Sequence, residues 1–348
     1  MLQDQTEQRD LQCPNCAGQR VFDPAERALC CQSCGDAETL NTDVDGHAAA
    51  EFPYDPDTPR SEAICAFRTQ AHHCETCGGD VTFTGAALSE RCPYCDGPVV
   101  LAPADIAFQT MALIPFSEPL AQAETLAQGW IQRRWAAPND LAAAVAKGRI
   151  AGLYAPFFTF DSEEALQYWA RYKVKSGKKT YSRSTTGRMH ISFDDLLVPA
   201  SHHVTPLIRD GILHDFDSAR LRPFDPGYLA GFAAERHHQS LAEGLRSNED
   251  DKDLLIRNRI KRHVNKRGVH SIRYRTDTSG IHYRRILLPV WILHYQYKGK
   301  PMQVIVSGID GRTFGTRPFS AFKLAAFSAA LTAAALAFGV FWGAAGFL

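Results

Sequence analysis

Eight cysteines repeat one spacing twice, and this repeat constrains the N-terminal third of the chain more than any other feature. Each set has the form C-x2-C-x14-C-x2-C, and a shift of 61 positions superimposes one set on the other. The sets are Cys13, Cys16, Cys31 and Cys34, then Cys74, Cys77, Cys92 and Cys95. Two C-x2-C turns present four thiolates, which is the closed tetrahedral shell of a structural Zn²⁺ site. The spacing therefore predicts two zinc ions, each bound by four cysteines.

Each cysteine set encloses two short apolar segments separated by a turn. The first set holds "GQRVF" and "ALCCQ", and the second holds "GDVTF" and "LSER". This order of knuckle, strand, turn, strand and knuckle is typical of small β zinc ribbons, which we expect at residues 1–35 and 71–101. Gly35 and Gly78 directly follow a ligand, where a positive φ turns backbone N–H groups toward sulfur. Ala17 and Asp96 take that place in the other two knuckles.

Other uses of the cysteines are disfavoured. A dithiol switch needs a βαβ surrounding that the sequence lacks, and the polar start "MLQDQTEQRDLQ" has no apolar core of a secretory signal, so disulfides are not expected. Cys30 stands beside Cys31 and aligns with Arg91 of the second set. Cys31 is therefore the better ligand, although an exchange between these adjacent thiols stays open. Cys65 fits a small buried apolar residue.

The C-terminal end of the chain is apolar. From Leu324 to Leu348 there is no charged residue over 25 positions, and about 20 helical residues cross a bilayer. We expect a transmembrane tail anchor at residues 319–348, with a buried helix of a soluble core as the competing interpretation. Arg312, Arg317 and Lys323 precede the segment. The positive-inside bias then predicts a single-pass protein of the inner membrane with its N-terminal domains in the cytoplasm.

The segment between the ribbons and the tail predicts a linker and a packed domain. Residues 36–70 read as an acidic linker, and residues 102–318 as an α+β domain. Helical spacing is clear in "PLAQAETLAQGWIQRRW", and "GLYAPFFTFD" with "LQYWARYKV" predicts a strand pair. The same order returns later, with Pro115-Phe116 matched by Pro223-Phe224 and Pro156 by Pro289. The pattern predicts an internal duplication.

Charge limits the choice of partner. The chain has 38 basic and 38 acidic residues, and the ribbons are poor in positive charge, which argues against nucleic-acid binding. A basic run extends from Arg257 to Arg275. Its members predicted to contact anionic lipid are Arg257, Arg259, Lys261, Arg262, Lys266 and Arg267. The alternative is a solvated face offset by the upstream acidic segment "SNEDDKD".

Several segments together resemble a family of bacterial zinc-ribbon membrane proteins. They are the paired "CPNC…CQSC" and "CETC…CPYC" knuckles, "GLYAPFFTFD", "LLPVWILHYQYKGKPMQVIVSGIDGRTFGTRP" and the terminal apolar helix. Family members are often labelled "primosomal protein N′ (replication factor Y), superfamily II helicase". Relatives are encoded near homologues of phage-shock protein A and stomatin- or flotillin-like proteins. The resemblance implies a role in membrane stress or membrane organisation.

The helicase label does not fit the residues. A helicase motor needs the loop G-x-x-x-x-G-K-[ST], and the nearest segment, "SGKKT" at 176–180, has Tyr172 in place of the first glycine and Lys179 in place of Ser or Thr. No G-x-S-x-G or H-E-x-x-H motif occurs either, and closed thiolate shells leave no open metal position. We therefore expect a non-enzymatic, membrane-anchored adaptor that recruits a protein partner. The alternative is a nucleic-acid-binding zinc-ribbon protein near the membrane.

Overall fold

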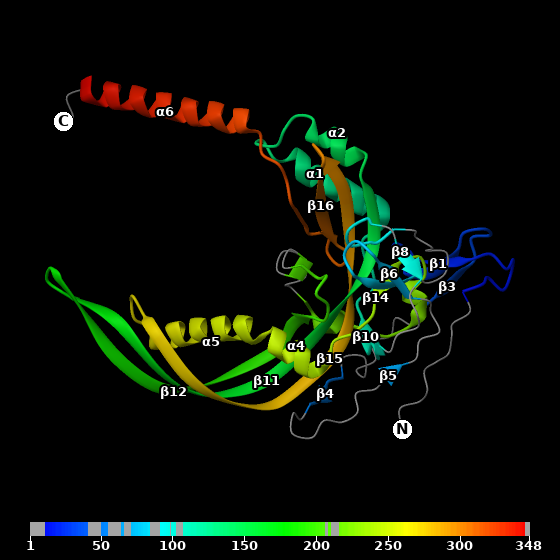
Figure 1. Cartoon of the computed structure of the whole chain (residues 1–348), viewed down its shortest axis with the longest axis horizontal. Coiled ribbons are helices and arrows are strands. Elements are labelled where there is room, and N and C mark those ends of the chain that lie inside the picture. Colours follow the sequence, from blue (N-terminus) through cyan, green and yellow to red (C-terminus); the bar gives the residue numbers. More distant parts are fainter. Residues whose placement is uncertain are drawn as a thin grey trace.

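The structure is a computed structural model, and Figure 1 shows its cartoon. It describes residues 11–40, 50–54, 64–65, 71–83, 91–97, 99–101, 107–205, 208–209 and 216–344. Residues 88–90 of the predicted strand "LSER" and the side chain of Cys65 lie outside this description. The described chain contains two cysteine-bearing units, a sheet-rich domain and a long apolar C-terminal helix. This order agrees with the predicted multidomain organisation.

The first cysteine-bearing unit has a sheet of its own. Strands β1 (Arg20–Asp23), β2 (Ala28–Cys31) and β3 (Ala37–Thr39) pair in that order, all antiparallel. β1 and β2 match the predicted strands, and β3 extends the sheet beyond residue 35, into the stretch expected to be linker. Phe22 and Leu29 are buried between this sheet and the rest of the molecule.

Twelve described strands form one large sheet. They are β4 (Phe52–Pro53), β6 (Ala71–Cys74), β7 (Asp80–Phe83), β8 (Val99–Leu101), β10 (Ala112–Leu113), β11 (Arg149–Ser176), β12 (Lys179–Pro199), β13 (Arg222–Pro223), β14 (Ala233–Glu235), β15 (His270–Tyr297), β16 (Lys300–Ser307) and β17 (Thr313–Gly315). Eight of these strands are hydrogen-bonded neighbours in the order β13-β10-β15-β11-β14-β7-β6-β8. The second ribbon, which contains β6, β7 and β8, is therefore continuous with the domain sheet. A separate pair joins β5 (Ile64–Cys65) to β9 (Ala107–Phe108). Two stretches of the predicted linker, β4 and β5, are therefore strands.

The longest strands, β11 and β15, have 28 residues each and pair antiparallel along most of that length. The prediction of two strands between residues 149 and 176 is wrong, because β11 runs through both segments without a turn. Its first half is buried on both faces, whereas from Glu163 buried and exposed residues alternate. Bulges near Asp161 and Arg171 interrupt the register with β15, and bulges bend strands. The distal half of the sheet curves away as an arm, which β12 completes (Figure 1).

Helices cover the sheet at two places. Near the top of Figure 1 lie α1 (Leu120–Gln132) and α2 (Leu141–Ala146), and the concave face of the arm carries α4 (Leu241–Ser247) and α5 (Glu249–Val264). α1 confirms the predicted helix, with Ala127 and Trp130 buried, but Leu120 is 46% exposed rather than part of the apolar face. α5 places Ile256 and Ile260 against Leu166 and Ile191 of the arm. The basic run from Arg257 to Arg275 therefore spans the second half of α5 and the start of β15.

The predicted duplication places a helix after Pro223-Phe224, as α1 follows Pro115-Phe116, but the first α-helix there begins only at Leu241. Residues 218–235 instead contain the short 3-10 helices Ser218–Arg220 and Pro226–Leu229, β13 and β14. Asp225 caps the second 3-10 helix and Gly231 has a φ of 91°, so a regular α-helix does not pass through this segment. α4 starts with a capping box in which Ser240 and Glu243 satisfy each other's backbone N–H groups.

One buried carboxylate joins the arm to α5. Glu164 of β11 is fully buried, forms an ion pair with Lys252 of α5, and accepts hydrogen bonds from Thr276 and Thr278 of β15. Burial opposes ionisation of Glu164, but the Lys252 ammonium and the two hydroxyls outweigh burial and lower the pKa of the carboxyl. The ionised group therefore stabilises the fold at neutral pH.

We expect Glu164→Gln to lower the free energy of unfolding by about 3 kcal/mol, because Lys252 loses its buried partner. Glu163→Gln, at the exposed neighbour, should change it by less than about 0.5 kcal/mol. The pKa of Glu164 is lowered in the native state, so its contribution is present above its ordinary pKa and is lost as the pH falls through the native value. Unfolding curves recorded across acidic pH check this. Equal stability of the two variants at pH 7 would refute the role of the carboxylate.

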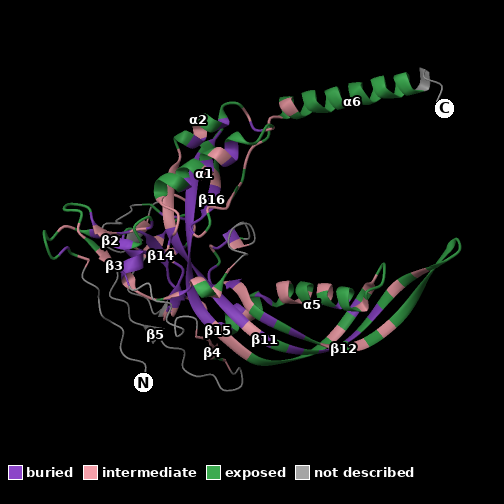
Figure 2. Ribbon diagram, turned by 180° about the vertical axis from the view of Figure 1, so that it is seen from behind, coloured by how far each residue is buried: buried purple, intermediate pink, exposed green. Residues whose placement is uncertain are grey.

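The C-terminal helix α6 (Ala321–Ala344) projects from the domain. Its segment Ala321–Trp342 has a mean hydropathy of 2.0 and no burial, so it is long and apolar enough to cross a membrane. Only its start touches the described domain. Lys323 Nζ donates to the Ala137 carbonyl at 2.7 Å, and the rings of Phe327 and Trp135 lie 4.9 Å apart. Figure 2 shows α6 exposed along its length, in contrast to the buried central sheet.

Candidate metal centres

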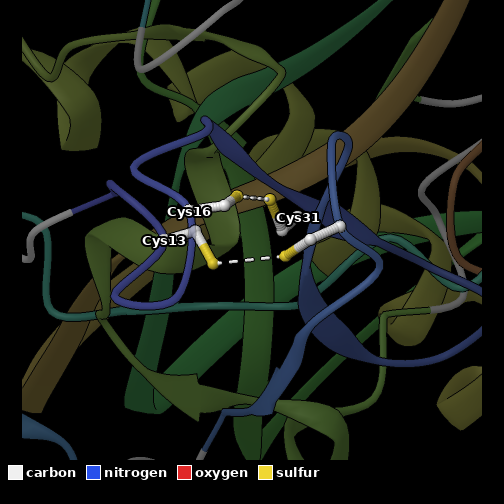
Figure 3. A group of neighbouring side chains, drawn as sticks. Cys13, Cys16 and Cys31 are labelled. Carbon is white, nitrogen blue, oxygen red and sulfur yellow. Dashed lines mark hydrogen bonds between the residues drawn. The ribbon is translucent and has the colours of Figure 1, made fainter.

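The structure brings each predicted cysteine set together as one cluster. Within each set the four sulfur atoms lie within 4.8 Å of one another. The Sγ atoms of Cys13 and Cys34 are 3.6 Å apart, and those of Cys16 and Cys31 are 3.5 Å apart (Figure 3). In the second cluster the corresponding distances are 3.5 and 3.7 Å. A tetrahedron with Zn–S bonds of about 2.3 Å has sulfurs about 3.8 Å apart, so both clusters have the dimensions of a four-thiolate metal site.

Backbone conformation explains how each C-x2-C turn closes. The residue after the second cysteine of every knuckle has a positive φ: 56° at Ala17, 76° at Gly35 and Gly78, and 61° at Asp96. The N–H of this residue bonds to the carbonyl of the first cysteine, as from Ala17 to Cys13 at 2.8 Å. Other amides turn to sulfur, as Gly97 N does toward Cys95 Sγ at 3.4 Å. The positive φ that we expected at Gly35 and Gly78 therefore also occurs at Ala17 and Asp96, although neither is glycine.

Thiol acidity differs within the clusters. N–H groups of Cys34 and Ser33 lower the pKa of Cys31 to about 6, and the pKa of Cys74 falls to about 7 because the Cys77 and Thr76 amides outweigh its burial. In contrast, burial raises the pKa of Cys95 to about 12. Four thiolates without a cation repel one another, so only part of each cluster ionises alone. A divalent cation removes this repulsion, so the remaining thiols ionise when the metal binds. Metal binding therefore releases protons.

The structure also separates Cys30 from Cys31. Cys31 is buried in the cluster, whereas Cys30 is not part of it and lies 3.9 Å from the Ala28 carbonyl. Successive residues of a strand point to opposite faces, and both lie on β2. The choice of Cys31 over Cys30 that the alignment favoured is the one that the geometry supports.

The second cluster is held firmly by the domain sheet. His294 donates from Nε2 to the Pro93 carbonyl at 2.8 Å, and Gln303 Nε2 donates to the Tyr94 carbonyl at 2.5 Å. The Tyr94 hydroxyl donates to Glu235 of β14, whose other oxygen accepts from Ser201 at 2.6 Å. Burial raises the pKa of Glu235 to about 7. None of these partners was expected, because they lie far from Tyr94 in sequence.

The first ribbon contacts the domain mainly through Phe22. Phe22 N donates to the Ala230 carbonyl at 3.0 Å, and the Phe22 ring meets Tyr228 edge-on with 5.2 Å between centroids. Within the ribbon, buried Arg20 pairs with Asp36 at 3.0 Å and with Glu38. Between both ribbons and the domain lies a groove of about 770 Å³. Its apolar lining includes Phe22, Pro24, Phe83, Pro93, Leu120, Phe232 and Trp291.

One further group has metal-compatible geometry among the described residues. Carboxylate oxygens of Glu51, Asp161 and Asp194 lie within 4.8 Å of one another. Arg284 accounts for part of this gathering, because its guanidinium pairs with Glu51 and Asp195. Burial and the Asp161 carboxyl raise the pKa of Glu51 to about 7. Residues so distant in sequence gave no pattern, so this cluster was missed.

Three histidines that could offer a ring nitrogen to a metal have other partners. His73 pairs with Asp80 at 2.7 Å, and His72 packs edge-on against Phe83 with 5.1 Å between centroids. His237 is fully buried, where desolvation lowers its pKa to about 3, and its Nε2 donates to the Phe157 carbonyl at 3.2 Å. His72 and His73, which directly precede Cys74, therefore make these contacts within the second ribbon.

Comparison with known proteins shows a similarity over most of the chain. The chain is 26% identical over 326 residues to the protein "Uncharacterized protein YdjG" of Bacillus subtilis (strain 168), covering 90% of this chain and 91% of that protein. No family model matches the chain. No solved structure matches it either.

We expect two zinc ions per chain in the purified protein, measured by inductively coupled plasma mass spectrometry. Cys74→Ser should lower the value to about one, because a three-thiolate shell binds Zn²⁺ much more weakly. Cys30→Ser, which changes the same atom type one residue from a ligand, should leave two. A loss of zinc in Cys30→Ser but not in Cys31→Ser would contradict the ligand assignment.

Proposed function

We propose that this protein is a membrane-anchored zinc-ribbon adaptor that recruits a protein partner to the cytoplasmic face of the inner membrane. The observation that carries the proposal is the combination, in one chain, of two four-cysteine clusters and an unburied apolar helix of membrane-spanning length. Zinc in this proposal is structural, since all four positions at each ion belong to cysteine. The ribbons are too small to fold on a core of their own, so the metal supplies part of their stability.

The groove between the ribbons is the proposed partner site. Both ribbons contribute to it, and its apolar residues are the surface type that fills with a partner's side chains. Leu120 lines the groove and is 46% exposed, so a partner would bury it. The resemblance to zinc-ribbon membrane proteins supports a partner from membrane stress or membrane organisation.

The domain order supports the predicted duplication. Two helices, a 28-residue strand and an antiparallel return strand occur as α1, α2, β11 and β12, then as α4, α5, β15 and β16. The two long strands pair so that Tyr154 faces Pro289 and Pro156 faces Leu287. The two matched prolines therefore lie on either side of a local two-fold axis. We propose that gene duplication produced this pair of α+β units.

The membrane anchor can be tested on the full chain. Alkaline carbonate extraction should leave the wild-type protein in the membrane pellet. Leu331→Arg with Leu336→Arg should release it, because each arginine near the helix centre costs about 2.5 to 3.5 kcal/mol on insertion. Leu254→Arg, at an exposed leucine of α5, should leave it in the pellet. Release of the wild type would refute the anchor.

The adaptor role can be tested by affinity capture of the full chain from membranes. Leu120→Glu should reduce recovery of the partner by about tenfold or more, since it places a charge in the apolar groove. Leu254→Glu makes the same change at another exposed leucine and should retain the partner. Recovery of nucleic acid and polymerase subunits alone would favour the alternative, a nucleic-acid-binding zinc-ribbon protein.

A further inference from the structure

The free end of the β11–β12 hairpin is an exposed, uncompensated basic surface. Every residue from 175 to 184 is exposed, with Gly177 at φ 59° in the turn. Between residues 165 and 193 there are seven basic residues and no Asp or Glu. They are Arg171, Lys173, Lys175, Lys178, Lys179, Arg183 and Arg188. The same segment contains "SGKKT", which has no function as a phosphate-binding loop of a motor.

The fold brings the end of α5 to the same place. The Cβ and Cγ of Lys173 lie beside Gly268, at 3.2 and 3.3 Å from the position of a Cβ there, and Ser182 Oγ is 3.3 Å from the His270 ring. Lys266 and Arg267 immediately precede Gly268 in the chain. Residues 254–276 add eight basic residues, again without Asp or Glu. Two segments about 90 positions apart thus form one basic surface, here called the hairpin tip (residues 171–183 with 266–267).

Among the described residues, no acidic side chain neutralises the hairpin tip. Within the part of the chain that the structure describes, Lys173, Lys175, Lys178, Lys179, Lys266 and Arg267 form no ion pair. The acidic residues at the start of α5 do not reach them: Asp253 pairs with Arg257 at 2.6 Å and Lys252 with Glu164, both nearer the base of the arm. Repulsion among these charges costs stability, so an external anion is the group that would offset it.

The position of α6 indicates where that anion is found. α6 and the hairpin tip project to the same side of the molecule, and the ribbons lie on the opposite side (Figures 1 and 2). A spanning helix tilts by up to about 40°, which allows the tip to reach the headgroup plane that α6 enters. A protein tethered by α6 holds its tip at high effective concentration beside anionic headgroups, and nucleic acid has no comparable tether.

We infer that the hairpin tip is a membrane contact that binds the phosphates of anionic phospholipids, so that the protein meets the bilayer at two places. This inference rests on the proposed anchor. The sequence assigned lipid contact to six basic residues between Arg257 and Arg267, whereas the tip adds a hairpin and uses only Lys266 and Arg267 of that set. Two contacts on one side fix the orientation of the domain and direct the ribbons toward the cytoplasm.

The test uses the full chain reconstituted in vesicles. Amine acylation of Lys173 and Lys175, followed by mass spectrometry, measures the exposure of the tip. We expect labelling to be about fivefold slower or more in vesicles with 30% phosphatidylglycerol than in phosphatidylcholine alone. The difference should disappear at 1 M salt, where the Debye length is about 3 Å.

Two matched variants identify the charges responsible. Lys178→Gln with Lys179→Gln should reduce the protection of Lys173 and Lys175 to less than half. Arg27→Gln with Arg246→Gln removes the same charge from exposed sites off the tip and should retain it. Equal labelling in both lipids, or protection by a DNA duplex and not by phosphatidylglycerol, overturns the inference. Carbonate extraction of the same samples reports insertion of α6 separately, so failure of the anchor is distinguished from failure of the tip.

Discussion

The antiparallel pairing of β11 with β15 is the constraint on which the rest of the structure depends. Each strand has 28 residues, so one ladder passes through the domain core and continues into the arm. The core half is covered on both faces, and the arm half is covered on one face by α5. Other parts of the described large sheet attach to this ladder: β14 pairs with β11 and joins the second ribbon to it, and β16, with the path to α6, pairs with β15.

The two metal sites are alike in chemistry but differ in support. In the second, hydrogen bonds that His294 and Gln303 donate and that Glu235 accepts connect one knuckle to three strands of the large sheet. In the first, Phe22 provides the main contact with the domain. The second cluster is therefore coupled to the domain sheet, whereas the first is coupled mainly to its own three-stranded sheet. The groove between them depends on both.

Local chemistry accounts for what was predictable. A C-x2-C turn closes through contacts within a few residues, so both C-x2-C-x14-C-x2-C frames, the described strands β1, β2 and β7 within them, and α1 follow from spacing. The single 28-residue β11 was not foreseen, because its apolar first half and alternating second half resemble two strands when no partner is known. The links from Tyr94 to Glu235 and from Glu164 to Lys252 join positions 88 or more residues apart, and no periodicity encodes them.

The two cysteine frames and the apolar C-terminal helix can be derived from the sequence alone, because metal-ligand spacing and hydropathy are properties of contiguous residues. Three features required the fold: that Cys31 and not Cys30 completes its cluster, that the second ribbon joins the domain sheet, and that Lys173 and Lys266 share one basic surface. Each of these depends on which face or edge of a strand meets a distant segment. That choice is made by packing around the β11–β15 ladder.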